Sequence, residues 1–296
     1  MSDFYPVFDV SSVARDLIET MGTKRKFWFT RDGTRWLFKY SRPDTGEHWS
    51  EKVAAEIGAQ LGIPVAQVEL AMCNDTPGAC SKSFLPDKGV LVHGNELLQK
   101  VDQAYPVTEL RGVSKHTVDA VFAPLNDVEA PLGAPPTLSA ADCFVGYLLL
   151  DALIGNGDRH HENWAVIQDT ASRHLAPSYD HASSLGRELR DEVRSVRLGG
   201  LDQSRTVDRY AARATSAFYA SAADAKPLSP IEAFRVAARL RPAASAFWLA
   251  RLANLRHDTI ENIVYAVPTE LITAPARRFA LALTAWSRPR LLAVPG

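Results

Sequence analysis

The strongest constraint on the fold is an apolar run in the middle of the chain. Residues 143–154 are apolar apart from Gly146 and Asp151. Ser139-Ala-Ala-Asp142 before the run resembles a capping box, with Asp where Glu or Gln is usual, and predicts a helix that continues to about Ile154. The run is too short to cross a bilayer, so we expect a helix buried in a protein core.

The sequence before this helix is typical of short strands. Lys26–Phe29 and Arg35–Tyr40 flank Asp32-Gly33, and an Asp-Gly pair between two aromatic-rich runs predicts a hairpin. Residues 67–72 and 79–83 are predicted as a second pair of strands around the turn residues 74–78.

Two helices are predicted in the same part of the chain. Val10–Thr20 has helical apolar spacing, with Ser11 or Ser12 as its N-cap. Trp49–Leu61 has the same spacing and ends at Gly62, a residue typical of helix C-termini. We therefore expect a helix on either side of the first hairpin.

The order of elements predicts a two-lobed α+β fold. Residues 1–82 would form a small strand-rich lobe, residues 83–94 a connector, and residues 95–296 a larger, mainly helical lobe. Two short strands at 164–168 and 174–177 interrupt the helices of the larger lobe.

Charge and composition exclude several classes of function. The 296 residues carry a formal net charge of −1, so we expect no direct nucleic-acid binding and no membrane surface binding. No signal peptide is visible, and Cys73, Cys80 and Cys143 are too few for a disulfide scaffold. A cytoplasmic location is the expectation.

The chemistry is expected in a loop that follows the buried helix. The segment Gly155-Asn156-Gly157-Asp158-Arg159-His160-His161-Glu162-Asn163 is followed, across the strand pair, by Ser178-Tyr179-Asp180. Phosphoryl transfer needs positioning and charge neutralisation more than covalent chemistry. Asp158 is the candidate base for an attacking hydroxyl, and Asn163 and Asp180 offer the hard oxygen ligands that Mg²⁺ requires.

The small lobe would supply the groups that hold the nucleotide. Lys39 lies in an apolar strand, where a charge requires a partner, and could reach the phosphates. Glu51 is the best-placed carboxylate to hold it, with Glu56 as the second choice. The loop Gly22-Thr23-Lys24 could cover the phosphates, although one glycine is a weak motif.

Other interpretations of these residues were weighed. Taken singly, Asp158 fits a turn, and Asp180 could cap a helix that begins at His181. His160-His161-Glu162 contains the H-x-E triplet of zinc deaminases, but no P-C-x-x-C and no second zincin histidine follow it, so zinc is not expected. No G-x-S-x-G elbow supports a hydrolase.

Together these segments resemble the HipA-like serine/threonine kinase family, which has a protein-kinase-like fold. The resemblance includes the Gly22 loop, Phe38-Lys39, Glu51 through Pro64, the catalytic loop and Tyr179-Asp180. The motif Asp-Arg-His-x-x-Asn is also similar to that of phosphatidylinositol kinases.

The resemblance implies roles for individual residues. Asp158 would be the catalytic base, Asn163 and Asp180 the Mg²⁺ ligands, Lys39 the phosphate lysine, and His160 a residue that structures the loop. The backbone near Lys82 and Phe84 would hold the adenine of ATP at the hinge.

The chain departs from the family in two respects. The extra N-terminal portion of full-length HipA toxins is not seen before Gly22, so a short form is expected. The family's regulatory serine has no counterpart beside Gly22, where the neighbours are Met21 and Thr23. Autoregulation at this loop and toxin activity are therefore not carried over by the resemblance alone.

The resulting hypothesis is an ATP- and Mg²⁺-dependent kinase that phosphorylates a serine or threonine of a protein substrate. A toxin-antitoxin role with an antitoxin-like protein partner is a further implication of the family. The alternatives are a small-molecule or lipid kinase with the same ATP site, and a non-catalytic nucleotide-binding module.

Overall fold

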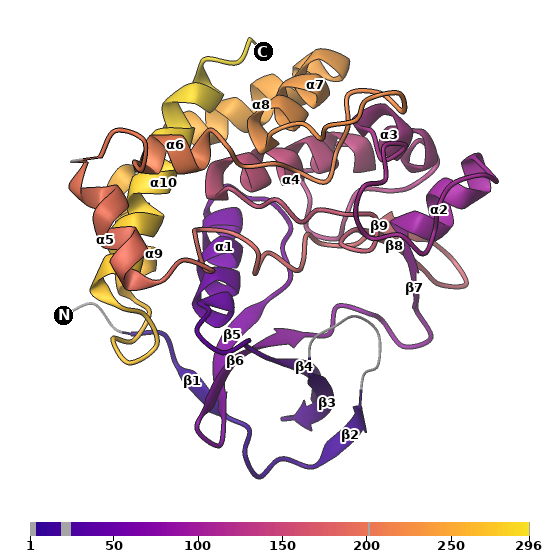
Figure 1. The fold of residues 1–296 in the computed structure, drawn as a ribbon. Coiled ribbons are helices and arrows are strands. Elements are labelled where there is room, and N and C mark those ends of the chain that lie inside the picture. The colour runs from indigo at the N-terminus through magenta and orange to yellow at the C-terminus, as the bar shows by residue number, and fades with distance from the viewer. Residues whose placement is uncertain (1–3, 19–24, 201, 296) are drawn as a thin grey trace.

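The first part of the chain folds into a sheet with one helix packed on it (Figure 1). The computed structural model describes residues 4–18, 25–200 and 202–295. The six strands lie in the order β1-β5-β6-β4-β3-β2. Helix α1 (Glu47–Gln60) packs on β5 and β6 and also contacts two helices of the C-terminal part. The strands are β1 (Val7–Asp9), β2 (Arg15–Ile18), β3 (Lys26–Arg31), β4 (Thr34–Tyr40), β5 (Val68–Cys73) and β6 (Thr76–Lys82).

The predicted hairpin is confirmed as β3 and β4. Asp32 and Gly33 have φ values of 50° and 69°. Two successive left-handed residues are the signature of the type I′ turn that Asp-Gly favours, because its twist matches that of the paired strands. The turn sets the register in which Lys26 lies opposite Lys39.

The helix predicted over Val10–Thr20 is wrong. Residues 15–18 form strand β2, which pairs antiparallel with β3 so that Arg15 lies opposite Phe29 and Ile18 opposite Phe27. Inter-strand hydrogen bonds to β3 satisfy the backbone here, and this tertiary pairing overrides a local apolar spacing. Residues 19–24 lie outside the described part of the chain.

The remainder of the chain is mainly helical and is built around the predicted apolar helix, α4 (Ala140–Ile154) (Figure 1). Its capping box is confirmed: Asp142 N–H donates to Ser139 Oγ at 3.2 Å, and Ser139 N–H donates to the Asp142 carboxylate at 3.0 Å. Every residue of α4 except Asp142 is buried, against α7, α8 and α10. None of the helices that the structure describes is both long and apolar enough to span a bilayer.

The other elements surround this helix. A three-stranded sheet has the order β7-β8-β9 and includes the predicted strand pair after the loop that carries Asp158. Its strand β7 lies within the segment predicted as a connector. The elements are β7 (Val90–His93), α2 (Gly94–Val101), α3 (Val118–Leu125), β8 (Ala165–Gln168), β9 (Arg173–Leu175), α5 (Asp191–Gly199), α6 (Val207–Ala211), α7 (Pro230–Leu240), α8 (Pro242–Asn254), α9 (His257–Tyr265) and α10 (Ala274–Leu292).

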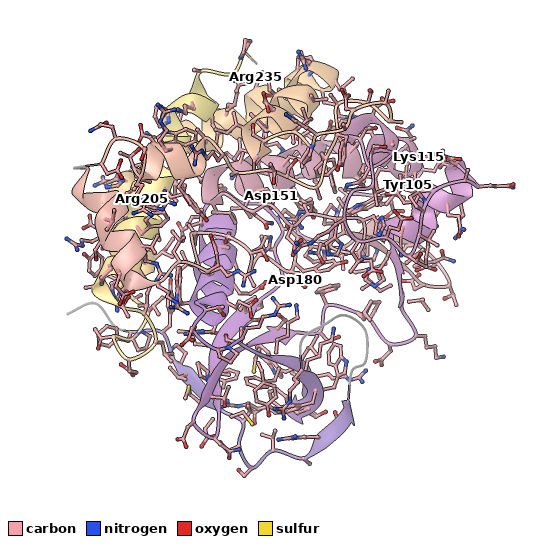
Figure 2. The ribbon with its side chains drawn as sticks, in the orientation of Figure 1. Tyr105, Lys115, Asp151, Asp180, Arg205 and Arg235 are labelled. Carbon is pink, nitrogen blue, oxygen red and sulfur yellow. The ribbon has the colours of Figure 1, made fainter. Side chains whose placement is uncertain are left out.

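A buried arginine joins the loop after α4 to the strand segment that follows β9. Arg159 is 1% exposed, and its Nε and Nη2 donate to the two carboxylate oxygens of Asp151, both at 2.8 Å. Nη1 donates to the backbone oxygens of Asn163 (2.9 Å) and Tyr179 (3.2 Å), and Nη2 also donates to Ser178 Oγ (2.9 Å). One side chain thus holds the two segments that carry Asp158 and Asp180 in position; Figure 2 labels Asp151 on α4 and Asp180 between α4 and the large sheet.

Two neutral, buried histidines lie at the same loop: His161 belongs to it, and His116 contacts Trp164, the residue that follows it. The indole of Trp164 can only donate, and it donates to His116 Nε2 at 3.3 Å. The proton of His116 is therefore on Nδ1, which donates to Ala217 O at 3.0 Å. His161 Nδ1 is 3.0 Å from Tyr105 Oη. Burial lowers the pKa of His116 to about 3 and that of His161 to about 4, so both rings are neutral at pH 7.

We expect Asp151→Asn to lower the free energy of unfolding by about 3–5 kcal/mol, because it leaves the Arg159 cation buried without its counter-charge. Urea unfolding measures this change. The control is Asp258→Asn, which removes the carboxylate of an ion pair with Arg256 whose side chains are 77% and 50% exposed, and which should change stability little. Equal effects of the two substitutions would contradict the role given to Arg159.

Because His116 and His161 are buried in their neutral form, we expect the protein to lose stability in acid. In the unfolded chain a histidine has a pKa of about 6.5, so below that pH the unfolded chain binds protons that the folded chain does not. The free energy of unfolding should therefore fall as the pH falls, by about 2 kcal/mol per histidine between pH 6.5 and 5. Urea unfolding at pH 7 and pH 5 should show a shallower fall for His116→Gln than for the unmodified chain; identical falls would contradict the prediction.

Candidate active site

The two parts of the chain meet at an ion pair between Lys39 and Asp180. Lys39 lies on β4, and its Nζ is 3.1 Å from Asp180 Oδ2. Burial alone would lower the pKa of Lys39, but the charges of Asp180 and Glu51 outweigh burial and raise it, so the amine is charged. Asp180 has φ 57°, a left-handed backbone that is uncommon outside glycine and that often marks a functional position.

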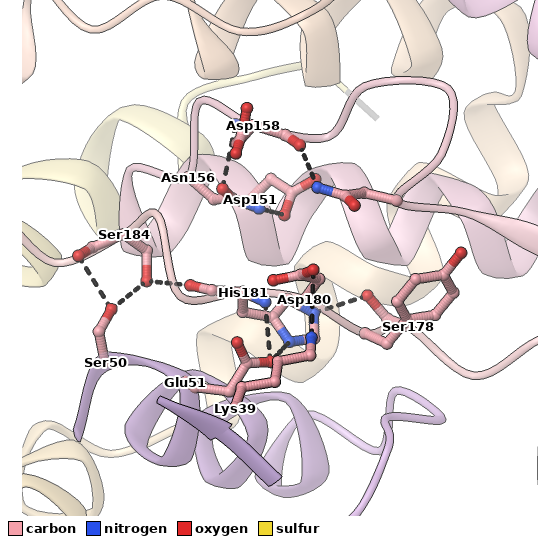
Figure 3. Close-up of polar contacts among 12 residues, drawn as sticks. Lys39, Ser50, Glu51, Asp151, Asn156, Asp158, Ser178, Asp180, His181 and Ser184 are labelled. Carbon is pink, nitrogen blue, oxygen red and sulfur yellow. Dashed lines mark hydrogen bonds and ion pairs between the residues drawn. The ribbon is translucent and has the colours of Figure 1, made fainter. Parts of the chain in front are cut away.

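Glu51 is tied to the same segment. It is buried on α1, and its Oε1 accepts a hydrogen bond from the backbone N–H of His181 at 2.9 Å (Figure 3). The second choice, Glu56, is wrong, because its carboxylate is 2.8 Å from Lys52 Nζ. The structure thus brings Glu51, Lys39 and Asp180 together at the boundary between the small sheet and the helical part.

The backbone after Asp180 is held by a chain of polar contacts rather than by a helix. His181 Nε2 is 2.7 Å from Ser178 Oγ, which also accepts from Arg159. Burial lowers the pKa of His181 far below its usual value, so the ring is neutral and shares a single proton with Ser178 Oγ at Nε2. The alternative in which Asp180 caps a helix at His181 is therefore wrong; the first described helix after Asp180 is α5.

Asp158 and Asn163 are oriented by each other. Asn163 Nδ2 donates to the backbone oxygen of Asp158 at 2.6 Å, so the Oδ1 of Asn163 is the amide atom left for a cation. The backbone N–H of Asp158 donates to Asn156 Oδ1 at 3.1 Å, which fixes the start of the loop. The carboxylate of Asp158 accepts from Ser183 Oγ at 3.2 Å.

His160 stabilises the turn between these residues. The ring Nδ1 of His160 accepts a hydrogen bond from the backbone N–H of Glu162 at 3.2 Å. The backbone N–H of His160 donates to the backbone oxygen of Asp158 at 2.8 Å. Burial lowers the pKa of His160 despite the attraction of Asp158, which favours a neutral ring at pH 7.

A cleft of about 510 Å³ lies between the sheet and the helical part, and most of the predicted site residues line it. This volume lies within the usual range for cofactor and ligand sites. At one end Phe84 packs against Tyr179, with ring centroids 5.7 Å apart. The predicted residues that line the cleft are Lys39, Lys82, Phe84, Asp158, His160, Asn163 and Asp180. The predicted phosphate-loop residues Gly22, Thr23 and Lys24 lie outside the described residues.

The oxygen atoms in this cleft fit a magnesium ion. Asn163 Oδ1 and the Asp180 carboxylate are hard donors, and Mg²⁺ is usually held by one or two carboxylates together with water and substrate phosphates. Within residues 4–18, 25–200 and 202–295, no cluster of three or more His, Cys, Asp or Glu forms a metal site made by protein alone.

Two residues of the site were missed from the sequence. Ser183 Oγ contacts Asp158, and Arg187 Nη2 donates to Ser183 Oγ at 3.2 Å. Arg187 Nη1 also donates to Glu47 Oε1 at 2.9 Å, which links the segment after Asp180 to the start of α1. Neither residue has a local motif; only the neighbouring Asp180 could have drawn attention to them.

A second chamber of about 370 Å³ adjoins the cleft at Asp158. Arg111, His160, Ser183 and Arg187 line both the cleft and the second chamber. Thr215, Ser216 and Ala217 also line the second chamber. A hydroxyl compound that entered this chamber would meet Asp158.

Comparisons with known proteins agree with this architecture. The HipA-like C-terminal domain matches residues 18–248. The proinflammatory kinase CtkA of Helicobacter pylori has a similar structure, with a TM-score of 0.77 and 18% identity over 98% of this chain and 96% of CtkA. HipA of Shewanella oneidensis MR-1, solved with HipB and its operator DNA, has a TM-score of 0.58 and 12% identity over 97% of this chain and 67% of HipA. No curated protein sequence matches the chain.

The structural likenesses show that the fold is kinase-like, with a strand-rich sheet and a helical part, as the order of elements predicted. The family match covers most of the sequence, including the loop of Asp158 and the segment of Asp180. The chain therefore belongs to the HipA-like C-terminal domain family.

Proposed function

We propose that the chain is an ATP- and Mg²⁺-dependent kinase that transfers the γ-phosphate to a serine or threonine of a protein. The observation that carries the proposal is the convergence of Lys39, Asp158, Asn163 and Asp180 on one cleft. These are the positioning and charge-neutralising groups that phosphoryl transfer requires. Membership of the HipA-like family supports the same reaction class.

Each residue has a distinct role in this proposal. Asp158 would accept the proton of the attacking hydroxyl, and Lys39 would neutralise phosphate charge once Asp180 turns to the metal. Asn163 Oδ1 and Asp180 would hold Mg²⁺. When bound, the ion neutralises the charge that develops on the phosphate oxygens. Glu51 would act through its contacts with the Asp180 segment rather than on the substrate.

The hinge is proposed at Phe84. Lys82 N–H already donates to Gln67 O, and Ser83 N–H donates to Arg35 O, both at 2.9 Å. Among the described residues none accepts from Phe84 N–H, so this donor is available to adenine. The division into residues 1–82, the connector 83–94 and residues 95–296 belongs to the same proposal.

A second candidate is transfer to a small molecule. The second chamber has room for a compact acceptor and is lined by Asp158, which makes such an acceptor a rival to a protein segment. A protein partner of the antitoxin type is a further part of the proposal, because the HipA structure in the comparison contains HipB.

We expect Asp158→Asn to slow transfer of label from γ-labelled ATP by about 10²- to 10⁴-fold, the usual contribution of a general base, while ATP binding is retained. Asp180→Asn should abolish transfer and weaken Mg²⁺-dependent nucleotide binding, since a metal ligand is lost. Labelling and calorimetric titration with Mg²⁺-ATP measure the two effects.

The control is Asp224→Asn. The Asp224 carboxylate is exposed and accepts a hydrogen bond from Ser221 Oγ, so its loss should leave both transfer and nucleotide binding unchanged. Undiminished transfer by Asp158→Asn would contradict its role as base. Binding of ATP without turnover by the unmodified chain would instead support the non-catalytic module.

A panel of acceptors decides between the two candidate substrates. We expect label on serine or threonine of a protein acceptor such as casein, and none on sugars, nucleosides or phosphoinositide vesicles. Label found only on a small molecule would reject the protein-kinase proposal and support the second candidate.

A further inference from the structure

The hydroxyl of Ser183 lies where a phosphate acceptor must lie. Its Oγ donates to Asp158 Oδ2 at 3.2 Å, and Asp158 is the proposed base. A hydroxyl that is hydrogen-bonded to a carboxylate is in the arrangement that precedes proton removal and nucleophilic attack. Ser183 is only partly buried and lines both the cleft and the second chamber, so its Oγ is reachable by a phosphate group.

Neighbouring hydroxyl groups are engaged elsewhere. Ser178 Oγ is buried between Arg159 and His181. Ser184 Oγ is buried and donates to His181 O at 2.8 Å. In the part of the chain that the structure describes, Ser183 is the hydroxyl that bonds to the Asp158 carboxylate.

Arg187 makes Ser183 a better acceptor position. Its Nη2 donates to Ser183 Oγ at 3.2 Å, so the hydroxyl accepts one hydrogen bond, donates one to Asp158, and keeps a lone pair for attack. A guanidinium at this distance also stabilises the phosphate that would be formed, because arginine binds phosphate oxygens in a planar fork.

We propose that Ser183 is a phosphorylation site of this chain, modified by its own active site. The inference rests on the proposed kinase function and adds an acceptor to it. The bond between Ser183 Oγ and the γ-phosphorus of ATP forms, and the bond from that phosphorus to the oxygen bridging to the β-phosphate breaks. The hydroxyl proton passes to the Asp158 carboxylate, and ADP leaves.

The modification would alter the contact between the two lobes. A phosphate on Ser183 competes for Arg187 with Glu47, which also pairs with Arg42 Nη1 at 2.9 Å and so keeps a partner. The phosphate also places about two negative charges beside Asp158, where an external hydroxyl would have to bind. The phosphorylated chain is therefore expected to lose most of its transfer to external acceptors.

The test is site mapping by mass spectrometry after incubation of the full chain with Mg²⁺-ATP. We expect phosphoserine at position 183, formed at a rate per molecule that does not depend on chain concentration. Ser183→Ala should lose this phosphate and Ser183→Thr should carry phosphothreonine. The matched control is Thr215→Ala, which removes a hydroxyl of the same chamber and should leave Ser183 phosphorylated.

Several results would overturn the inference. Transfer to an external acceptor with Ser183 unmodified would reject it and leave the kinase proposal intact, whereas absence of both ATP turnover and ATP binding would reject both. Phosphorylation of Ser183 at an unchanged rate in Asp158→Asn, or in proportion to chain concentration, would reject the step within one chain. Full activity of the separated phosphorylated chain would reject its effect on transfer.

Discussion

The site depends on the buried ion pair between Arg159 and Asp151. A guanidinium cannot lose its proton inside a protein, so its burial requires a counter-charge and a full set of acceptors. Asp151 supplies the charge from the core helix α4, and the backbone oxygens of Asn163 and Tyr179 supply acceptors on two loops. The carboxylates of Asp158 and Asp180 are therefore placed by an interaction that involves neither of them.

The segment after Asp180 is the element through which the two lobes contact each other. Asp180 pairs with Lys39 on β4, His181 N–H donates to Glu51 on α1, and Arg187 donates to Glu47 at the start of α1. Ser50 Oγ adds a bond to Ser184 O at 2.9 Å. Because these contacts are charged or buried, movement of the segment would change the position of the small lobe, and a charge added at Ser183 would act at this junction.

Family membership and site geometry support different parts of the interpretation. The family match and the structural likenesses establish a HipA-like chain with a kinase-like fold. At 18% and 12% sequence identity, these structural similarities establish the fold of the chain but do not identify its substrate. The proposed chemistry instead rests on the convergence of Lys39, Asp158, Asn163 and Asp180 on one cleft.

The sequence by itself determined the features whose cause is local. Asp32-Gly33 fits a type I′ turn, Ser139 and Asp142 cap α4, and the spacing from Asp158 to Asn163 places a carboxylate and an amide on one loop. Asp151 was also visible as a charge within an apolar helix, although its partner was not. Tertiary structure decided what depends on distant contacts. Residues 15–18 form a strand because β3 pairs with them, and Ser183 meets Asp158 because Arg159 joins their loops. Glu56 pairs with Lys52, whereas Glu51 accepts a hydrogen bond from the backbone of His181. Local patterns record backbone preference and burial, whereas partner choice depends on the packing of segments far apart in sequence.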